Sequence, residues 1–299
     1  MTAAGSLVWK AQAGDQAIYQ SGAFAWKPWS NPRQIPNVGS SGGIAATRTP
    51  DQSITVIAHQ GANSDRKIWL QKLDRETPLP QYVLPFETVD RPAIAYLGDR
   101  LCIAFRGVSD QFIRFAMEDG HGGWTAAQVA GLGVASSTHG PAMAVHNGRV
   151  FLAWKGSDSN QRLYSSSYDG AWTQPVELAG WSTHGPALAS NRGTLHLAYK
   201  GRNTDTELYH SASHDGLGWT AHKTAGGSTT CGPSLGTTTD RGVVMAWKGS
   251  PGDNRIFWSR DFGPQAPAHP YALTTDTPAI TGYDNPMVPV DFGTALEGY

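Results

Sequence analysis

Residues that could hold a metal ion or act in nucleophilic catalysis recur at one place in a repeated stretch of the sequence. The clearest copy of the stretch begins Ser137-Thr-His-Gly-Pro-Ala, and the residue before its Gly-Pro pair differs between copies. Aspartate, histidine and cysteine are ligands of zinc, iron and copper, and a cysteine beside a histidine can form a nucleophilic site. In chain order, the residues at this place are Ser41, Asp90, His139, His184, Cys231 and Asp276.

If the copies close into a ring, these side chains meet at one mouth of a central channel. One hypothesis is therefore an enzyme with a single axial site, in which Arg91 supplies a cation to an anionic substrate. The catalytic candidates are Asp90, Arg91, His139, His184 and Cys231. The candidate ligands of one transition metal are Asp90, His139, His184, Cys231 and Asp276. The alternative is structural, because His139 and His184 lie in nearly identical copies and could descend from one hydrogen-bonded histidine.

The elements that would position these residues follow from the period of the repeat. The anchor positions Gly43, Pro92, Pro141, Pro186, Pro233 and Pro278 are separated by 49, 49, 45, 47 and 45 residues. A period in this range, built from short strands, is typical of a β-propeller. Each unit contains four strand-like segments separated by turn signals, of which Asn147-Gly148 favours a type I′ hairpin.

Counting strands predicts an all-β, six-bladed propeller of four-stranded blades, closed by strands from both termini. The N-terminal segment begins with a second strand at Leu7-Val-Trp-Lys10, and a first strand, Thr277-Pro-Ala-Ile-Thr281, comes near the C-terminus. We expect one domain over residues 1–283, followed by a tail at 284–299. The expected units are about 39–85, 86–133, 134–180, 181–227 and 228–275, with a closing blade from 1–38 plus 276–283.

Composition narrows the classes of partner. The formal net charge is -1, so neither nucleic acid nor an anionic membrane is an expected partner. Cys102 and Cys231 lie in different units without CxxC spacing, which indicates no disulfide framework or zinc finger. The N-terminal residues lack the pattern of a signal peptide. We therefore expect a soluble protein that is cytoplasmic, or released without a signal peptide.

Other positions are alike in every unit. An Asp or Asn precedes each third strand, where it could hold a loop or contribute to a carboxylate rim for calcium or sugar hydroxyls. Aromatic residues and lysines end the second strands, where they could pack between blades or present a rim on which sugars stack. The candidate ligand-binding residues of this second kind are Trp154, Lys155, Tyr199, Lys200, Trp247 and Lys248.

The pattern Gly-Pro-Ala-Leu-Ala … Leu-Ala-Trp-Lys-Gly … Asp-Gly-x-Trp resembles the repeat of lectin-like and sialidase-like β-propellers. This resemblance implies a carbohydrate-binding propeller without catalysis, whose ligand is a glycan or another small molecule. The arginine triad, acid and tyrosine nucleophile of a sialidase have no counterparts that we can place, so sialoside hydrolysis is not expected. The alternatives are the axial enzyme and a protein-interaction scaffold. The cofactor, if any, would be one transition metal or calcium, and the oligomeric state stays open.

Overall fold

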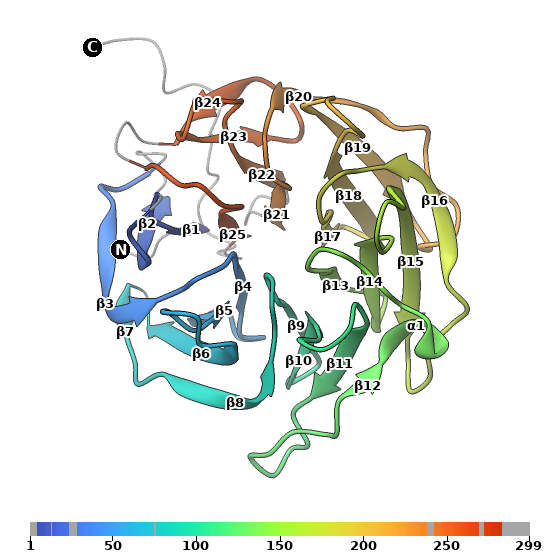
Figure 1. Cartoon of the computed structure of the whole chain (residues 1–299), viewed down its shortest axis with the longest axis horizontal. Helices are drawn as coiled ribbons and strands as arrows, with labels where there is room; N and C mark the ends of the chain where they lie inside the picture. The colour runs from blue at the N-terminus through green and yellow to red at the C-terminus, as the bar shows by residue number, and fades with distance from the viewer. Residues whose placement is uncertain are drawn as a thin grey trace.

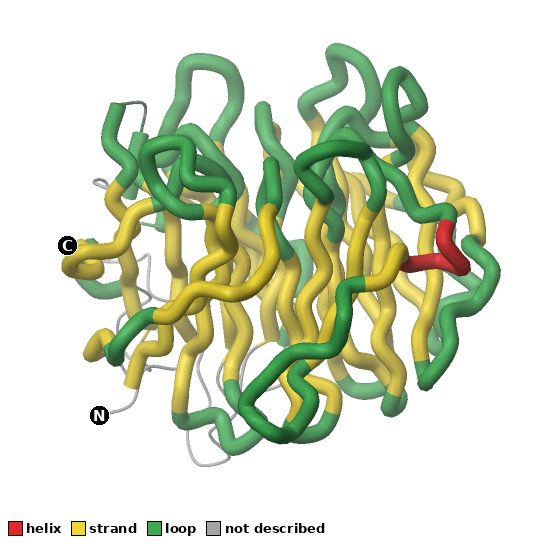
Figure 2. The backbone as a smooth tube through the Cα atoms, turned by 60° about the horizontal axis from the view of Figure 1, so that its bottom comes forward, coloured by secondary structure: helices red, strands yellow, loops and turns green. Residues whose placement is uncertain are grey.

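The computed structural model describes residues 5–12, 14–23, 29–74, 76–237, 242–268 and 272–282. Six antiparallel sheets are arranged around a central axis (Figure 1). Five sheets have four strands, and one has a fifth short strand. Seen from the side, the strands run together through the thickness of the ring, with loops at both ends (Figure 2). The molecule is thus a six-bladed β-propeller, which confirms the predicted fold.

Each sheet has a first strand next to the axis and a last strand at the circumference. The closing sheet contains β25 (Ala279–Gly282), β1 (Gly5–Lys10), β2 (Ala17–Ala23) and β3 (Arg33–Gly39). The next sheet contains β4 (Ile44–Arg48), β5 (Ile54–Gln60), β6 (Lys67–Asp74), β7 (Thr77–Pro78) and β8 (Tyr82–Glu87). The third contains β9 (Ala93–Leu97), β10 (Arg100–Arg106), β11 (Ile113–Met117) and β12 (Gln128–Val129).

The remaining three sheets follow the same order. The fourth contains β13 (Ala142–His146), β14 (Arg149–Lys155), β15 (Arg162–Tyr168) and β16 (Val176–Trp181). The fifth contains β17 (Ala187–Asn191), β18 (Thr194–Lys200), β19 (Glu207–Ser213) and β20 (Lys223–Ser228). The sixth contains β21 (Ser234–Thr237), β22 (Val243–Lys248), β23 (Ile256–Arg260) and β24 (Gln265–Pro267). A single helical turn, α1 (Ala130–Gly133), connects β12 to β13.

Both ends of the chain contribute to the closing sheet, as predicted. β1 pairs antiparallel with β25, with Leu7 opposite Ile280 and Val8 opposite Ala279. These side chains are almost completely buried. The ring therefore has no open edge between its first and last blades. The alternative second strand at 286–293 and the predicted tail at 284–299 lie outside the described residues.

Aromatic side chains of the second and third strands pack between the blades. Trp154 stacks on Tyr164 with ring centroids 6.1 Å apart, and Tyr199 stacks on Tyr209 at 5.7 Å. The first strands carry small residues where they crowd around the axis. Because first and second strands are antiparallel, each first strand begins beside the loop that follows the second strand. We call this side of the ring the Gly-Pro face, and the side where first strands turn into second strands the hairpin face.

The expected hairpin turn at Asn147-Gly148 lies on the hairpin face. Both residues have positive φ, 49° for Asn147 and 74° for Gly148. These angles match a type I′ turn, whose twist suits the two flanking strands.

Candidate functional site

The residues that precede the Gly-Pro pairs lie together on the Gly-Pro face. His139 and His184 are neighbours, with ring centroids 5.0 Å apart. Their Nδ1 atoms lie 3.2 and 3.0 Å from the hydroxyls of Thr138 and Thr183. Burial lowers the pKa of each histidine to about 4. Both imidazoles are therefore neutral at physiological pH.

Asp90, Asp276 and Cys231 of this ring have interaction partners within the protein. Asp90 accepts hydrogen bonds from the backbone amides of Arg91 at 2.6 Å and Gly140 at 3.0 Å. Asp276 forms an ion pair with Lys10 at 2.9 Å. The sulfur of Cys231 lies 3.4 Å from the carbonyl of Thr275, and burial raises its pKa. A thiol that stays protonated is a poor nucleophile.

Arg91 reaches across the axis. Its guanidinium donates to the carbonyl of Pro186 at 3.0 Å and to that of Pro233 at 3.4 Å. These bonds join the third blade to the fifth and sixth, so the cation expected to meet an anionic substrate is used in closing the channel. Within the described part of the chain, no three His, Cys, Asp or Glu side chains are grouped so that they could hold a metal ion.

The six expected rim residues lie inside the blades instead. Their exposed fractions run from 0% for Trp247 to 6% for Lys248. The lysines point inward because their ammonium groups bind two chain segments of the same blade. Lys200 donates to Thr183 Oγ1, in the segment before the first strand, at 2.9 Å, and to the Asp205 carbonyl, in the loop after the second strand, at 2.8 Å. Trp154, Lys155, Tyr199, Lys200, Trp247 and Lys248 are thus placed as packing and loop-anchoring residues, which corrects the expectation that they are exposed.

An exposed tryptophan between two blades provides a different site. Trp181 ends β16 and is 40% exposed. The guanidinium of Arg202, in the neighbouring blade, lies 4.4 Å from the indole ring centre, and that of Arg162 lies 5.8 Å from it. Cation–π contact with two arginines holds the indole in one orientation.

Two hollows flank this indole. One has a volume of about 300 Å³, and its lining includes Trp181, Arg202, Tyr209 and His222. The other, of about 250 Å³, includes Asn160, Arg162, Trp181 and Arg202. We call the two hollows together the Trp181 site.

The polar groups of the Trp181 site are fixed by hydrogen bonds. Asp205 accepts a hydrogen bond from the Tyr209 hydroxyl at 3.0 Å. Gln161 and Asn203 exchange two hydrogen bonds, of 3.0 and 2.9 Å, between the two blades. Such an arrangement of a flat aromatic face, cations and hydroxyl or amide groups suits a ring that has one apolar face and several hydroxyls.

Trp181 was missed by the sequence analysis, although the repeat contains a signal for it. At the equivalent place the other copies have small, polar or aliphatic residues: Gly39, Glu87, Ser136, Ser228 and Leu273. Arg202 is likewise the single basic residue at its place, where the other copies have Gln12, Ala62, Val108, Ser157 and Ser250. Both departures occur at the same junction between blades. In this chain, the signal for the Trp181 site is therefore two residues that differ from their equivalents in the other copies, and not residues that all copies share.

Within the described ranges, no helix is long and apolar enough to cross a membrane. No protein-family model and no curated protein matches the chain. Solved structures do resemble it. AofleA from Arthrobotrys oligospora has a TM-score of 0.65 and 12% identity, covering 94% of this chain and 86% of its own. A six-bladed fungal lectin, Aleuria aurantia lectin, described with a novel mode of fucose recognition, has a TM-score of 0.55 and 13% identity, covering 75% and 76%.

A microbial sialidase, Hz136, is also similar, with a TM-score of 0.57 and 13% identity. The match covers 77% of this chain but 57% of the sialidase. At these identities the likeness concerns the fold. The chain therefore shares its six-bladed architecture with lectin-like and sialidase-like propellers, and its own residues must identify its ligand.

Proposed function

We propose that the protein is a carbohydrate-binding propeller without catalysis, and that the Trp181 site binds the sugar. The observation that carries this proposal is the exposed indole of Trp181, which contacts Arg162 and Arg202 and borders two hollows. One face of a pyranose is apolar and stacks on an aromatic ring, while its hydroxyls need donors and acceptors. Arg202 and His222 supply donors, and the Asp205 carboxylate supplies acceptors.

The fold adds support, because one of the similar structures is a fungal lectin described by its fucose recognition. Fucosylated oligosaccharides are therefore the first ligands to test. The buried groups on the Gly-Pro face support catalysis less well. Its thiol is protonated, its arginine is bonded to carbonyls, and its histidines are neutral.

The test is a glycan array followed by calorimetric titration of the strongest ligand. We expect Trp181→Ala to weaken binding at least about tenfold, which corresponds to about 1.4 kcal/mol. The control is Phe112→Ala, because Phe112 is 39% exposed and occupies the place of Arg162 in the preceding blade. That variant should bind like the wild type.

Two results would contradict the proposal. If no glycan binds the wild-type protein, the lectin function is wrong. If a glycan binds equally well after Trp181→Ala, carbohydrate binding stands but the site is elsewhere. In that second case, loss of binding in a His139→Ala/His184→Ala variant that still folds would indicate that the glycan binds on the Gly-Pro face.

A further inference from the structure

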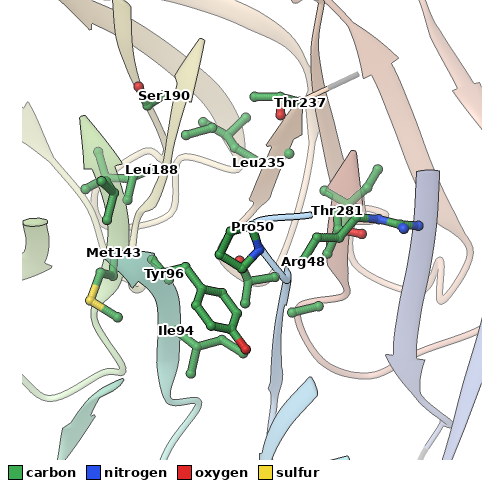
Figure 3. A pocket seen from close by; sticks show the side chains of 18 of the residues that line it. Arg48, Pro50, Ile94, Tyr96, Met143, Leu188, Ser190, Leu235, Thr237 and Thr281 are labelled. Atoms are coloured by element: carbon green, nitrogen blue, oxygen red, sulfur yellow. The ribbon is translucent and has the colours of Figure 1, made fainter. Parts of the chain in front are cut away.

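A third hollow lies on the axis of the ring, away from the Trp181 site. It has a volume of about 340 Å³ and is lined by residues of the first strands (Figure 3). This volume is at the lower end of the range of small-molecule sites, about 300–1,000 Å³. The hollow opens on the hairpin face, where the lining includes Pro50 and Gly98 of the turns.

The side chains of the first strands form two layers along this axis. Residues two apart in a strand point to the same side, so each layer takes one residue from each blade. The inner layer, two residues after the anchor positions, is apolar, with Ile94, Met143, Leu188, Leu235 and Ile280. The outer layer, two residues further on, carries hydroxyl groups from Thr47, Tyr96, Ser190 and Thr237.

The hollow narrows toward the Gly-Pro face. A smaller space of about 70 Å³ continues from the apolar layer to Arg91, Pro92 and Pro141. The bonds from Arg91 to the carbonyls of Pro186 and Pro233 cross the axis at that end. The axial hollow is therefore a blind funnel with an apolar interior and a hydroxyl-lined mouth.

Among the described residues that line this hollow, only Tyr96 and Arg48 carry ionisable groups. Burial, with a smaller contribution from Glu118, raises the pKa of Tyr96 to about 12. Its hydroxyl is therefore a neutral donor at physiological pH. Arg48 donates to the Gln52 carbonyl at 2.9 Å and to the Ser6 hydroxyl at 3.2 Å. These bonds hold the guanidinium in the wall, where it joins β4 to β1.

We propose that this funnel is a binding site for a neutral amphiphile, with an alkyl or aryl end in the apolar layer and a hydroxylated end at the mouth. Burial of the apolar end supplies most of the binding free energy, because about 0.8 kcal/mol is gained for each methylene removed from water. The hydroxyls of the outer layer orient the polar end. This site differs in chemistry from the Trp181 site, which offers an exposed indole and cations.

The experiment compares two probes, octyl β-D-glucopyranoside below its micelle concentration and methyl β-D-glucopyranoside. Both carry the same sugar, so a difference in affinity reports on the alkyl chain. We expect the octyl compound to bind at least about tenfold more tightly by calorimetry. Intermolecular nuclear Overhauser effects should connect its chain to the methyl groups of Met143 and Leu188.

Three variants separate this site from other surfaces. Val145→Trp places a large ring at the mouth and should weaken octyl glucoside binding at least about tenfold. The control Val83→Trp adds the same volume to β8, where Val83 is 44% exposed, and should have no effect. Trp181→Ala should leave the difference in affinity between the octyl and methyl compounds unchanged, because it acts at the other site.

Equal affinities of the two probes for the wild-type protein would overturn the proposal. So would an advantage of the octyl over the methyl compound that survives Val145→Trp or disappears in Trp181→Ala. If Val145→Trp does not fold, the Overhauser contacts of the wild-type protein decide. Contacts to the inner layer support the funnel, and contacts confined to other residues refute it.

Discussion

The neighbouring histidines His139 and His184 connect burial to pH dependence. Their pKa values are about 4 in the folded protein, compared with about 6.5 in an unfolded chain. Between these values the unfolded chain binds more protons than the folded protein. The contribution of the two neutral histidines to the stability of the fold is therefore complete above pH 6.5, and it is lost as pH falls toward 4. We expect this pair to lower the free energy of unfolding by roughly 1–3 kcal/mol over that window, since both rings retain some contact with solvent.

The measurement is urea unfolding at pH 7 and pH 4.5 for the wild type and for His139→Asn/His184→Asn. Burial also lowers the pKa values of His59, His196 and His210, so the difference between the two proteins is the informative quantity. The double variant should lose less stability on acidification. An identical loss in both proteins would show that the pair does not contribute.

The direction of single side chains could not be predicted from the sequence. The repeat identified Lys155, Lys200 and Lys248 as equivalent, but a lysine at the end of a strand can face solvent or turn inward. The choice depends on three-dimensional partners, here the Thr183 hydroxyl and loop carbonyls for Lys200. The same limit applies to Trp181, which is 40% exposed and lines two hollows. Sequence could have marked its departure from the repeat, but not the two arginines beside its ring.

The elements themselves were predictable because local signals agree with one another. The period of the repeat and the glycine-containing turns together indicated four strands for each unit. The structure adds a reason for the glycine of the Gly-Pro pairs that precede β13, β17 and β21. A methyl group on Gly185 would overlap with the carbonyl oxygen of Gly140, and one on Gly232 would overlap with that of Gly185. The chain segments leading into successive first strands therefore meet backbone to backbone.

This close approach leads to a prediction for the Gly-Pro segments. Gly185→Ala should destabilise the protein by about 1–3 kcal/mol, because backbone atoms of two blades must move apart. The control is Gly218→Ala in the β19–β20 connection, where the nearest atom to an added methyl group is Asp215 Oδ1 at 3.9 Å. Thermal unfolding should show a lower Tm for the first variant and little change for the second. Equal Tm values would mean that the blades tolerate the added methyl group.

At the scale of the whole molecule, closure explains why binding sites between blades are available. β25 and β1 pair to complete the closing blade, so six junctions surround the axis. This closure was predictable from the strand count alone. The number of binding sites was not predictable in this way. A repeat architecture suggests several equal sites, whose weak affinities would add through multivalency.

The side chains at the junctions argue for one glycan site per chain. Trp181 and Arg202 occur together at a single junction of the repeat, and the equivalent positions elsewhere lack both an aromatic ring and a cation. We therefore expect titration with a monovalent glycan to give a stoichiometry of about one, since ring stacking supplies the main contact. A monomeric chain with one site should not cross-link carriers that display many copies of the same glycan. A stoichiometry close to the number of blades would contradict this, and would mean that positions shared by all units bind the sugar.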